Sequence, residues 1–304
     1  SIHSSRHKSS QQSRTRREKD RESAMDAFLA LLGDEIQDSS EETFTLFSQS
    51  HSTQDLGMLD PTAASVDITI GSRDFTITQS PGLLQSSREG GTTGAAVWRT
   101  SIFLAKWLDS TNNPLFAQGI IDASSTMMEL GSGISGLTAG VLAPKIARVV
   151  ATDQSYALKL LRQNIDSNQP TSRKKSAVPA CQIDTLSLDW EQDDVPSFLS
   201  LHNLAIGVDI LLASDCVYNY ALIEPFVNVC AEICRIRKGT EHNGEQAERP
   251  TLCIIAQQLR QPDVFEQWLE GFMGRFRVWR VPDDSLGRDV DKGSGFCIHV
   301  GVLR

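Results

Sequence analysis

Three glycines and one acid in the middle of the chain have the types and spacing of a nucleoside-binding unit. Gly131, Gly133 and Gly136 form a G-x-G-x-x-G pattern directly after the apolar run 126–130. Glycine has no Cβ, so the backbone can turn tightly there and lie against a ligand. Asp153 ends the next apolar run, where a carboxylate can accept hydrogen bonds from both hydroxyls of a ribose. The pattern therefore predicts a strand, a glycine turn, a helix and a second strand that together bind a nucleoside.

Glu129 separates two kinds of nucleoside. It stands two residues before the first glycine, where dinucleotide-binding folds usually have an apolar strand residue. A carboxylate there would repel a pyrophosphate, but it suits the ammonium group of S-adenosyl-L-methionine. We therefore expect this molecule as the cofactor, with an NAD-dependent oxidoreductase as the alternative. The glycine pattern alone is a weak signal, since ordinary turns between a strand and a helix also contain it.

Further candidate residues follow the third and fourth predicted strands. Ligands of a parallel sheet bind outside the carboxyl ends of its strands. Asp189 could bond the adenine amino group and Trp190 could stack on the ring, although core packing is the alternative for Trp190. Asp215 and Tyr218 follow the fourth strand and could frame an amine nucleophile. Asp215 is also suited to cap the helix that follows it.

The elements that position these residues alternate between strands and helices. Such alternation predicts an α/β fold with a doubly wound, Rossmann-like sheet. The last two strands have no helix between them, so they must form an antiparallel hairpin at one edge of a seven-stranded sheet. The predicted strands are 126–130, 147–152, 181–188, 208–214, 251–257, 276–281 and 296–303, and the predicted helices are 133–143, 155–168, 219–236 and 262–274.

The part before the sheet divides into an extension and the start of the folded domain. Residues 1–64 are polar and are expected to be largely disordered, with a short helix over 25–32. Residues 65–304 are expected to form one domain that begins with a hairpin over 66–79, because two alternating runs flank a turn there. A helix over 97–109 follows the hairpin, and a polar insert over 237–250 interrupts the domain later.

Charge and composition limit the classes of partner. The net charge is −9, but residues 1–24 hold seven Lys/Arg and three Asp/Glu, so the remainder has a net charge of −13. An acidic body favours a basic partner, with solubility alone as the alternative. No apolar run approaches the roughly 20 residues of a membrane span. The six cysteines lack the pairing of a metal site and indicate free thiols. A cytoplasmic or nuclear protein that binds neither a membrane nor a specific nucleic acid is expected.

Together these motifs resemble family 16 of the seven-strand lysine methyltransferases. The resemblance covers residues 66–304, and the fungal ribosomal lysine methyltransferases are the most similar subgroup. The family motifs are Thr92-Thr93-Gly94 before Trp98, which also resembles the subgroup, E-x-G-x-G-x-x-G from Glu129 to Gly136, Asp189-Trp190, and D-x-x-Y from Asp215 to Tyr218. The subgroup stretches are Ser86-Ser87-Arg88, Leu188-Asp189-Trp190-Glu191, Val217-Tyr218-Asn219, Leu222-Ile223-Glu224-Pro225-Phe226 and Leu259-Arg260.

The resemblance implies roles for individual residues. It implies that Asp215 and Tyr218 lie beside the channel for the acceptor lysine, and that the substrate is a basic protein such as a ribosomal protein. Ser214 departs from the family, which more often has a small apolar residue there. The protein is expected to act as a monomer, with a small-molecule amine methyltransferase and a non-catalytic binding module as alternatives. The positions that match donor-binding positions of the family are Trp98, Gly131, Ser132, Gly133, Asp153, Trp190 and Ser214.

Overall fold

The structure is a computed structural model. It describes residues 23–49, 57–85, 92–169, 180–239, 241–242, 245–246, 249–287 and 294–304. Several features of the sequence lie outside these ranges. They are the tail over 1–22, the stretch Ser86-Ser87-Arg88, the basic loop Arg173-Lys174-Lys175 and parts of the insert over 237–250.

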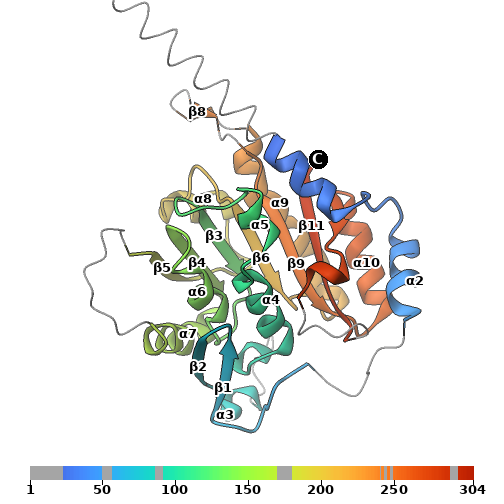
Figure 1. Cartoon of the computed structure of the whole chain (residues 1–304). Coiled ribbons are helices and arrows are strands. Elements are labelled where there is room, and N and C mark those ends of the chain that lie inside the picture. Colours follow the sequence, from blue (N-terminus) through green and yellow to red (C-terminus); the bar gives the residue numbers. More distant parts are fainter. Residues whose placement is uncertain are drawn as a thin grey trace, which may run out of the picture.

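A seven-stranded sheet forms the centre of the molecule (Figure 1). Its strands lie in the order β10-β11-β9-β6-β3-β4-β5. The pairs among β9, β6, β3, β4 and β5 are parallel, whereas β11 is antiparallel to both of its neighbours. This arrangement confirms the predicted fold class and the terminal hairpin. The strands are β3 (Thr126–Leu130), β4 (Arg148–Asp153), β5 (Gln182–Ser187), β6 (Ile210–Ser214), β9 (Leu252–Gln258), β10 (Phe276–Arg280) and β11 (Phe296–Leu303).

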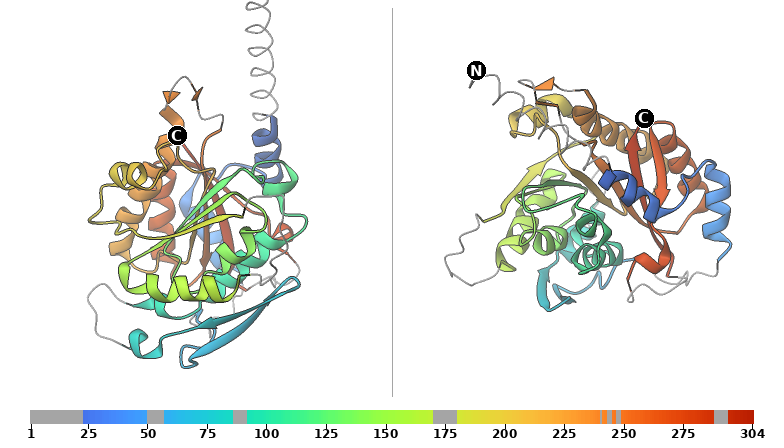
Figure 2. Two further views of the ribbon diagram at one scale, coloured as in Figure 1. Left: turned by 90° about the vertical axis from the view of Figure 1, so that its left-hand side faces the viewer. Right: turned by 45° about the horizontal axis from the view of Figure 1, so that its top comes forward.

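The central strands are nearly continuous apolar runs because helices cover both faces of the sheet. One face is covered by α4 (Arg99–Asp109), α6 (Leu137–Leu142) and α7 (Ser155–Ser167), whose buried residues form one cluster. The other face is covered by α8 (Val195–Leu201), α9 (Ile223–Gly239) and α10 (Pro262–Met273). Figure 2 shows the sheet between these two layers.

Helices α6, α8 and α9 differ from the expectation. α9 begins at Ile223 rather than at residue 219, and it extends to Gly239, into the predicted insert. α6 begins at Leu137, later than expected, because the chain still turns at Gly136, whose φ is 64°. α8 is not predicted by the sequence pattern, although Asp194 caps it by accepting a hydrogen bond from the Ser197 N–H. Shorter elements complete the described fold: α3 (Pro81–Leu84), α5 (Pro114–Ala117), η1 (Thr93–Ala95), η2 (Tyr220–Leu222), η3 (Asp283–Ser285), β7 (Glu241–His242) and β8 (Glu245–Gln246).

The predicted hairpin is present as β1 (Ser65–Ile70) and β2 (Arg73–Thr78). It lies at the foot of Figure 1 and of the left view in Figure 2. Asn164 of α7 and Asn168, directly after the last residue of α7, hold it in place. The Asn164 side chain accepts from the Thr78 N–H and donates to the Thr78 carbonyl, both at 2.9 Å. Asn168 makes the same pair of bonds with Thr76. The hairpin thereby anchors the chain that leads into residues 92–98.

The structure departs from the expectation of a flexible segment over residues 33–64. Helix α2 (Ser39–Phe47) lies there and packs against α10. Glu42 of α2 bonds Arg280 at 2.9 Å and the His299 ring at 3.1 Å. Because these contacts are far away in the sequence, local composition does not predict the helix. The short helix expected over 25–32 is present over residues 23–32, and it buries Phe28 in the core.

Chain topology places a crevice at the carboxyl ends of the strands. From β3 the chain proceeds through β4 to β5, and it then crosses to β6 on the opposite side of β3. Ligands of open α/β sheets bind at such a switch point.

Among the described residues, no helix is long and apolar enough to cross a membrane.

Candidate active site

The glycine turn after β3 forms the floor of a pocket at this switch point. Gly131, Gly133 and Gly136 have φ values of 61°, 59° and 64°, which favour glycine. A Cβ on Gly131 would lie 2.6 Å from the Cys216 sulfur, and one on Gly133 would lie 3.2 Å from the Gly94 carbonyl oxygen. The pattern in the sequence thus reflects both backbone conformation and close approach of neighbouring chain.

Asp153 ends β4 beside this turn. Its carboxylate accepts hydrogen bonds from the N–H groups of Gly133 and Gln154, each at 2.7 Å. Burial raises the pKa of Asp153 to about 6, although these two hydrogen bonds oppose the shift. The side chain therefore holds the glycine turn and lines the pocket as well.

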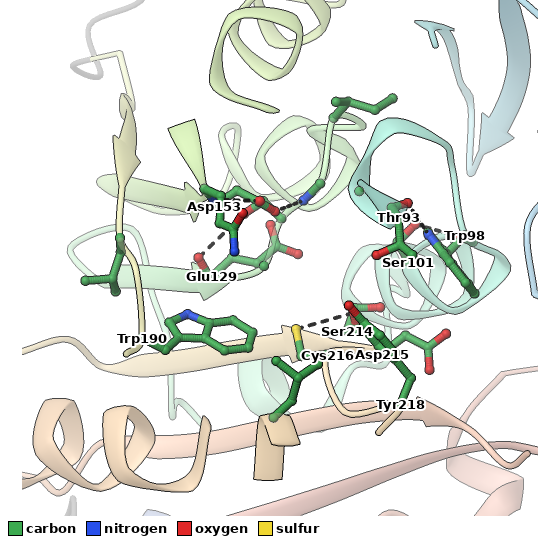
Figure 3. Close-up of a pocket in the computed structure, with 18 of the residues that line it drawn as sticks. Thr93, Trp98, Ser101, Glu129, Asp153, Trp190, Ser214, Asp215, Cys216 and Tyr218 are labelled. Carbon is green, nitrogen blue, oxygen red and sulfur yellow. Dashed lines mark hydrogen bonds between the residues drawn. The ribbon is translucent and has the colours of Figure 1, made fainter. Parts of the chain in front are cut away.

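Glu129 lies in the same part of the pocket, as Figure 3 shows. Its carboxylate accepts a hydrogen bond of 2.9 Å from the Thr138 hydroxyl. Burial raises the pKa of Glu129 to about 7, and the neighbouring Asp153 adds to this effect. In the part of the chain that the structure describes, no cationic side chain shifts either pKa. Two buried acids without a cation form a site that suits a positively charged ligand.

Residues 92–98 pack against the glycine turn, where the Gly94 backbone lies close to Gly133. The Trp98 indole N–H donates to the Thr93 carbonyl at 2.8 Å, and the Gly94 N–H donates to the Tyr156 hydroxyl at 3.2 Å. Thr93, Gly94 and Trp98 line the pocket. Gln79, directly after the hairpin, accepts a hydrogen bond from the Val97 N–H at 2.7 Å, so the hairpin that α7 holds in place is bonded to this wall of the site.

The end of β5 supplies a second wall. Asp189 and Trp190 both line the pocket. The centres of the Trp190 and Phe226 rings lie 5.3 Å apart, so Trp190 packs in the core and lines the pocket as well. The Asp189 carboxylate accepts a hydrogen bond from the Glu191 N–H at 3.0 Å and thus shapes its own turn.

Asp215 and Tyr218 lie at the other end of the pocket, beside Trp98 rather than beside Asp153 (Figure 3). Asp215 follows β6 with φ at 58°, an uncommon conformation for a residue other than glycine. Its carboxylate binds both terminal nitrogens of Arg260. Asp215 is therefore one half of an ion pair, and the N-cap of the following η2 is instead Asn219, whose side chain accepts a hydrogen bond from the Leu222 N–H at 3.2 Å. The Tyr218 side chain is 39% exposed.

These residues fit the cofactor expected from the sequence. The glycine turn leaves room for a nucleoside, Asp153 stands where a ribose diol is bound in such folds, and Glu129 suits an ammonium group. The Ser214 hydroxyl lines the same pocket and is buried without a hydrogen-bond partner among the described residues, so it too could bond a ligand. The buried Ser132 contributes to the floor through its backbone, which donates to the Thr152 carbonyl at 2.9 Å. Within the described ranges, no group of three or more His, Cys, Asp or Glu side chains could hold a metal ion.

The pocket thus brings together every site residue that the sequence indicated, but it adds three contacts. Arg260, Tyr156 and Thr100 each bond a residue of the pocket wall. The rule that ligands bind at strand ends could have indicated Arg260, since it follows the last residue of β9 by two positions. The positions of Tyr156 and Thr100 inside helices gave no such signal.

Curated relatives of two kinds match the chain. The ribosomal lysine N-methyltransferase 5 of Kluyveromyces lactis is 30% identical over 306 residues, which cover 82% of this chain and 91% of that protein. The protein of the same name from Zygosaccharomyces rouxii is 30% identical, and the match covers 65% of this chain and 70% of that protein. A protein of Schizosaccharomyces pombe, named diaminohydroxyphosphoribosylamino-pyrimidine deaminase, is 29% identical over 83% of this chain. The chain spans only 55% of that relative's length.

Solved structures of methyltransferases match the chain at low similarity. The N-methyltransferase NodS of Bradyrhizobium japonicum, in complex with S-adenosyl-L-homocysteine, is 11% identical with a TM-score of 0.39 over 68% of this chain and 85% of its own. The Pyrococcus abyssi tRNA (uracil-54, C5)-methyltransferase, also in complex with S-adenosyl-L-homocysteine, is 11% identical with a TM-score of 0.39. That match covers 80% of this chain and 45% of the other.

A family model assigns the pocket to a known class. The sequence model of a family described as "Lysine methyltransferase" matches residues 78–240, which is more than half of the chain. The matched range contains the glycine turn, Asp153, Trp190 and the Asp215–Tyr218 motif. The resemblance inferred from these motifs and the expected methyl donor, S-adenosyl-L-methionine, are therefore confirmed, and this chain belongs to the lysine methyltransferase family.

Proposed function

We propose that the protein methylates the ε-amino group of a lysine in a protein of the large ribosomal subunit. The main support for this proposal is that the residues expected to bind the methyl donor and the D-x-x-Y pair line one continuous pocket. Glu129 and Asp153 lie at one end, and Asp215 and Tyr218 lie at the other (Figure 3). The names of the yeast relatives support a ribosomal acceptor.

The residues of the chain have two tasks in this reaction. S-adenosyl-L-methionine supplies a methyl group that its sulfonium already activates, so the protein mainly has to align donor and acceptor. The acceptor amine must also lose a proton, because the unperturbed pKa of lysine is about 10.4. Tyr218 is exposed enough to meet an incoming side chain, and Asp215 lies behind it as a fixed, paired carboxylate. We assign these two residues to the acceptor end and the acidic pair to the donor end.

The test is methyl transfer from labelled S-adenosyl-L-methionine to ribosomal proteins of Saccharomyces cerevisiae. A strain that lacks its own ribosomal lysine N-methyltransferase 5 should supply an acceptor whose target lysine is unmodified. We expect one labelled protein of the large subunit, with the label on a lysine. Tyr218→Phe should reduce the label several-fold while S-adenosyl-L-homocysteine still binds, because the variant removes only a hydroxyl at the acceptor end.

Two other outcomes would favour the alternatives. Label in small molecules of the extract, with none in protein, would indicate a small-molecule amine acceptor. Binding of S-adenosyl-L-homocysteine without any transfer would indicate a binding module on the same fold. We place the reaction in the cytoplasm, or in the nucleus where ribosomal subunits are assembled, and fractionation of the cell with an antibody against the chain tests that location.

A further inference from the structure

The carboxylate of Asp215 is fully engaged before any acceptor arrives. Its two oxygens bind the two terminal nitrogens of Arg260, one of them at 2.7 Å. The Thr100 hydroxyl donates to it at 3.3 Å and the Gln258 N–H at 3.4 Å. Only 4% of the Asp215 side chain is exposed. A carboxylate in this state is a poor partner for a second cation.

Arg260 also contacts Trp98, which lies beside Asp215 at the same end of the pocket (Figure 3). Its guanidinium lies over the Trp98 ring, 5.1 Å from the ring centre. Trp98 also lies at the wall that covers the glycine turn, since its indole is bonded to Thr93. One arginine therefore contacts both Asp215 and a residue of the wall formed by residues 92–98.

The charge of this pair bears directly on the acceptor. A bare carboxylate beside the acceptor would stabilise its ammonium form and oppose the loss of the proton. An ion pair has no net charge, so it can position an amine without favouring the ammonium form to the same degree. The planar fork of arginine matches a carboxylate in two places, which lysine does not do.

We propose that Arg260 is a positioning residue that bridges Asp215 and Trp98 and neutralises the charge of Asp215, so that the acceptor amine meets an ion pair. This proposal rests on the proposed lysine acceptor. The other titratable side chains on the walls of the pocket are Glu129, Asp153, Tyr156, Asp189, Glu191, Cys216 and Tyr218. All of them are unchanged in the variants below, so their contribution to a pH profile cancels in the comparison.

The kinetic test measures kcat for ribosomal proteins as a function of pH, because kcat reports ionisations in the bound complex. In Arg260→Gln the rise of kcat should move to higher pH by about one unit, since the carboxylate of Asp215 is then unpaired. Arg260→Lys should keep the wild-type position of the curve at a lower rate. Arg260→Gln combined with Asp215→Asn should move the curve back. A uniform loss of rate without movement of the curve would overturn the proposal.

Arg277→Gln is the matched control. Arg277 also pairs with a carboxylate, that of Glu35 at 2.9 Å, and lies over a tryptophan ring, that of Trp279 at 4.9 Å. It lies on the edge strand β10 and does not line the pocket. We expect its pH profile to superimpose on that of the wild type. A shift equal to that of Arg260→Gln would show that the effect is general, and it would overturn the proposal.

A second readout does not depend on any acceptor. Arg260→Gln should lower the midpoint of chemical denaturation, because it leaves a buried carboxylate without its cation, and the added Asp215→Asn should restore much of the loss. If the wild type fails to label ribosomal proteins but this rescue is seen, the proposed function fails while the role of Arg260 in holding Asp215 stands. If labelling succeeds and no rescue occurs, the proposed role of Arg260 is wrong and the proposed function stands.

Discussion

Because Glu129 is buried, its contribution to donor binding should depend on pH. Its pKa is raised from 4.5 to about 7, so the folded protein binds more protons than the unfolded chain between these values. This group therefore lowers the free energy of unfolding as pH rises through that window. An ammonium group placed beside the ionised carboxylate would offset the cost, so the stabilising effect of a donor should grow with pH.

We expect S-adenosyl-L-homocysteine to bind about tenfold more tightly at about pH 7.5 than at about pH 5.5, where Glu129 is protonated. Glu129→Gln should bind more weakly at the higher pH and show a flatter profile. The remaining slope reports Asp153, whose pKa of about 6 lies in the same range. Calorimetric titration at both pH values measures this. An equal slope in the variant would mean that Glu129 does not contact the charged group.

Asp153→Ala should weaken the binding of S-adenosyl-L-homocysteine by at least tenfold. The change removes charge-assisted hydrogen bonds to the ligand and the two bonds that hold the Gly133 and Gln154 N–H groups. Asp166→Ala is the control, since Asp166 lies exposed on α7 and does not line the pocket. Unchanged affinity in a calorimetric titration of Asp153→Ala would remove this residue from the donor site.

Single residues were predictable from the sequence wherever their chemistry depends on their immediate neighbours along the chain. The glycine turn, Asp153 and the Asp215–Tyr218 motif each show themselves within a few positions of a strand end. The pairing of Asp215 with Arg260 could not be predicted in this way, since 45 positions separate the two residues. Only the register of β6 beside β9, with Ser214 opposite Ala256, brings their strand ends together.

At the scale of elements, helix α2 shows how distant contacts decide local structure. Its sequence, SSEETFTLF, is rich in Ser and Thr and gives no strong helical signal. Isolated helices of this length are marginal in water, so tertiary contacts must supply most of the stability. Those contacts are the Glu42 bonds to β10 and β11 and the packing of Phe47 on Phe265. The core strands, by contrast, were predictable because each one contains its own apolar run.

Glu42→Ala should lower the free energy of unfolding by about 3 kcal/mol, because it leaves the buried His299 without its carboxylate and leaves Arg280 with only the 3.9 Å pair to Asp283. Chemical denaturation measures the loss. The neighbouring Glu41 is exposed on the same helix, so Glu41→Ala should change stability by about 0.5 kcal/mol or less. Donor affinity should be the same in both variants, as neither residue lines the pocket. Equal stability of the two variants would mean that the Glu42 contacts do not hold α2 in place.

At the scale of the whole molecule, the net negative charge favours a basic protein over a small amine as the acceptor. Outside residues 1–24 the chain has 22 basic and 35 acidic residues, a net charge of −13. A field of this sign raises the rate at which a basic protein reaches the surface, and salt screens it. A small amine carries one charge and gains much less from the same field. Sequence composition predicts this effect directly, since it depends on total charge rather than on any single contact.

Raising the ionic strength from about 0.01 M to about 0.1 M shortens the screening length from about 30 Å to about 10 Å. With a basic ribosomal protein as acceptor, KM should rise several-fold over this range while kcat stays nearly constant, because salt weakens the approach and leaves the bound complex intact. The affinity for S-adenosyl-L-homocysteine, measured alongside, should change much less, since its site is buried. A KM that is independent of salt would indicate that the acidic surface serves solubility and that recognition of the acceptor rests on the pocket alone.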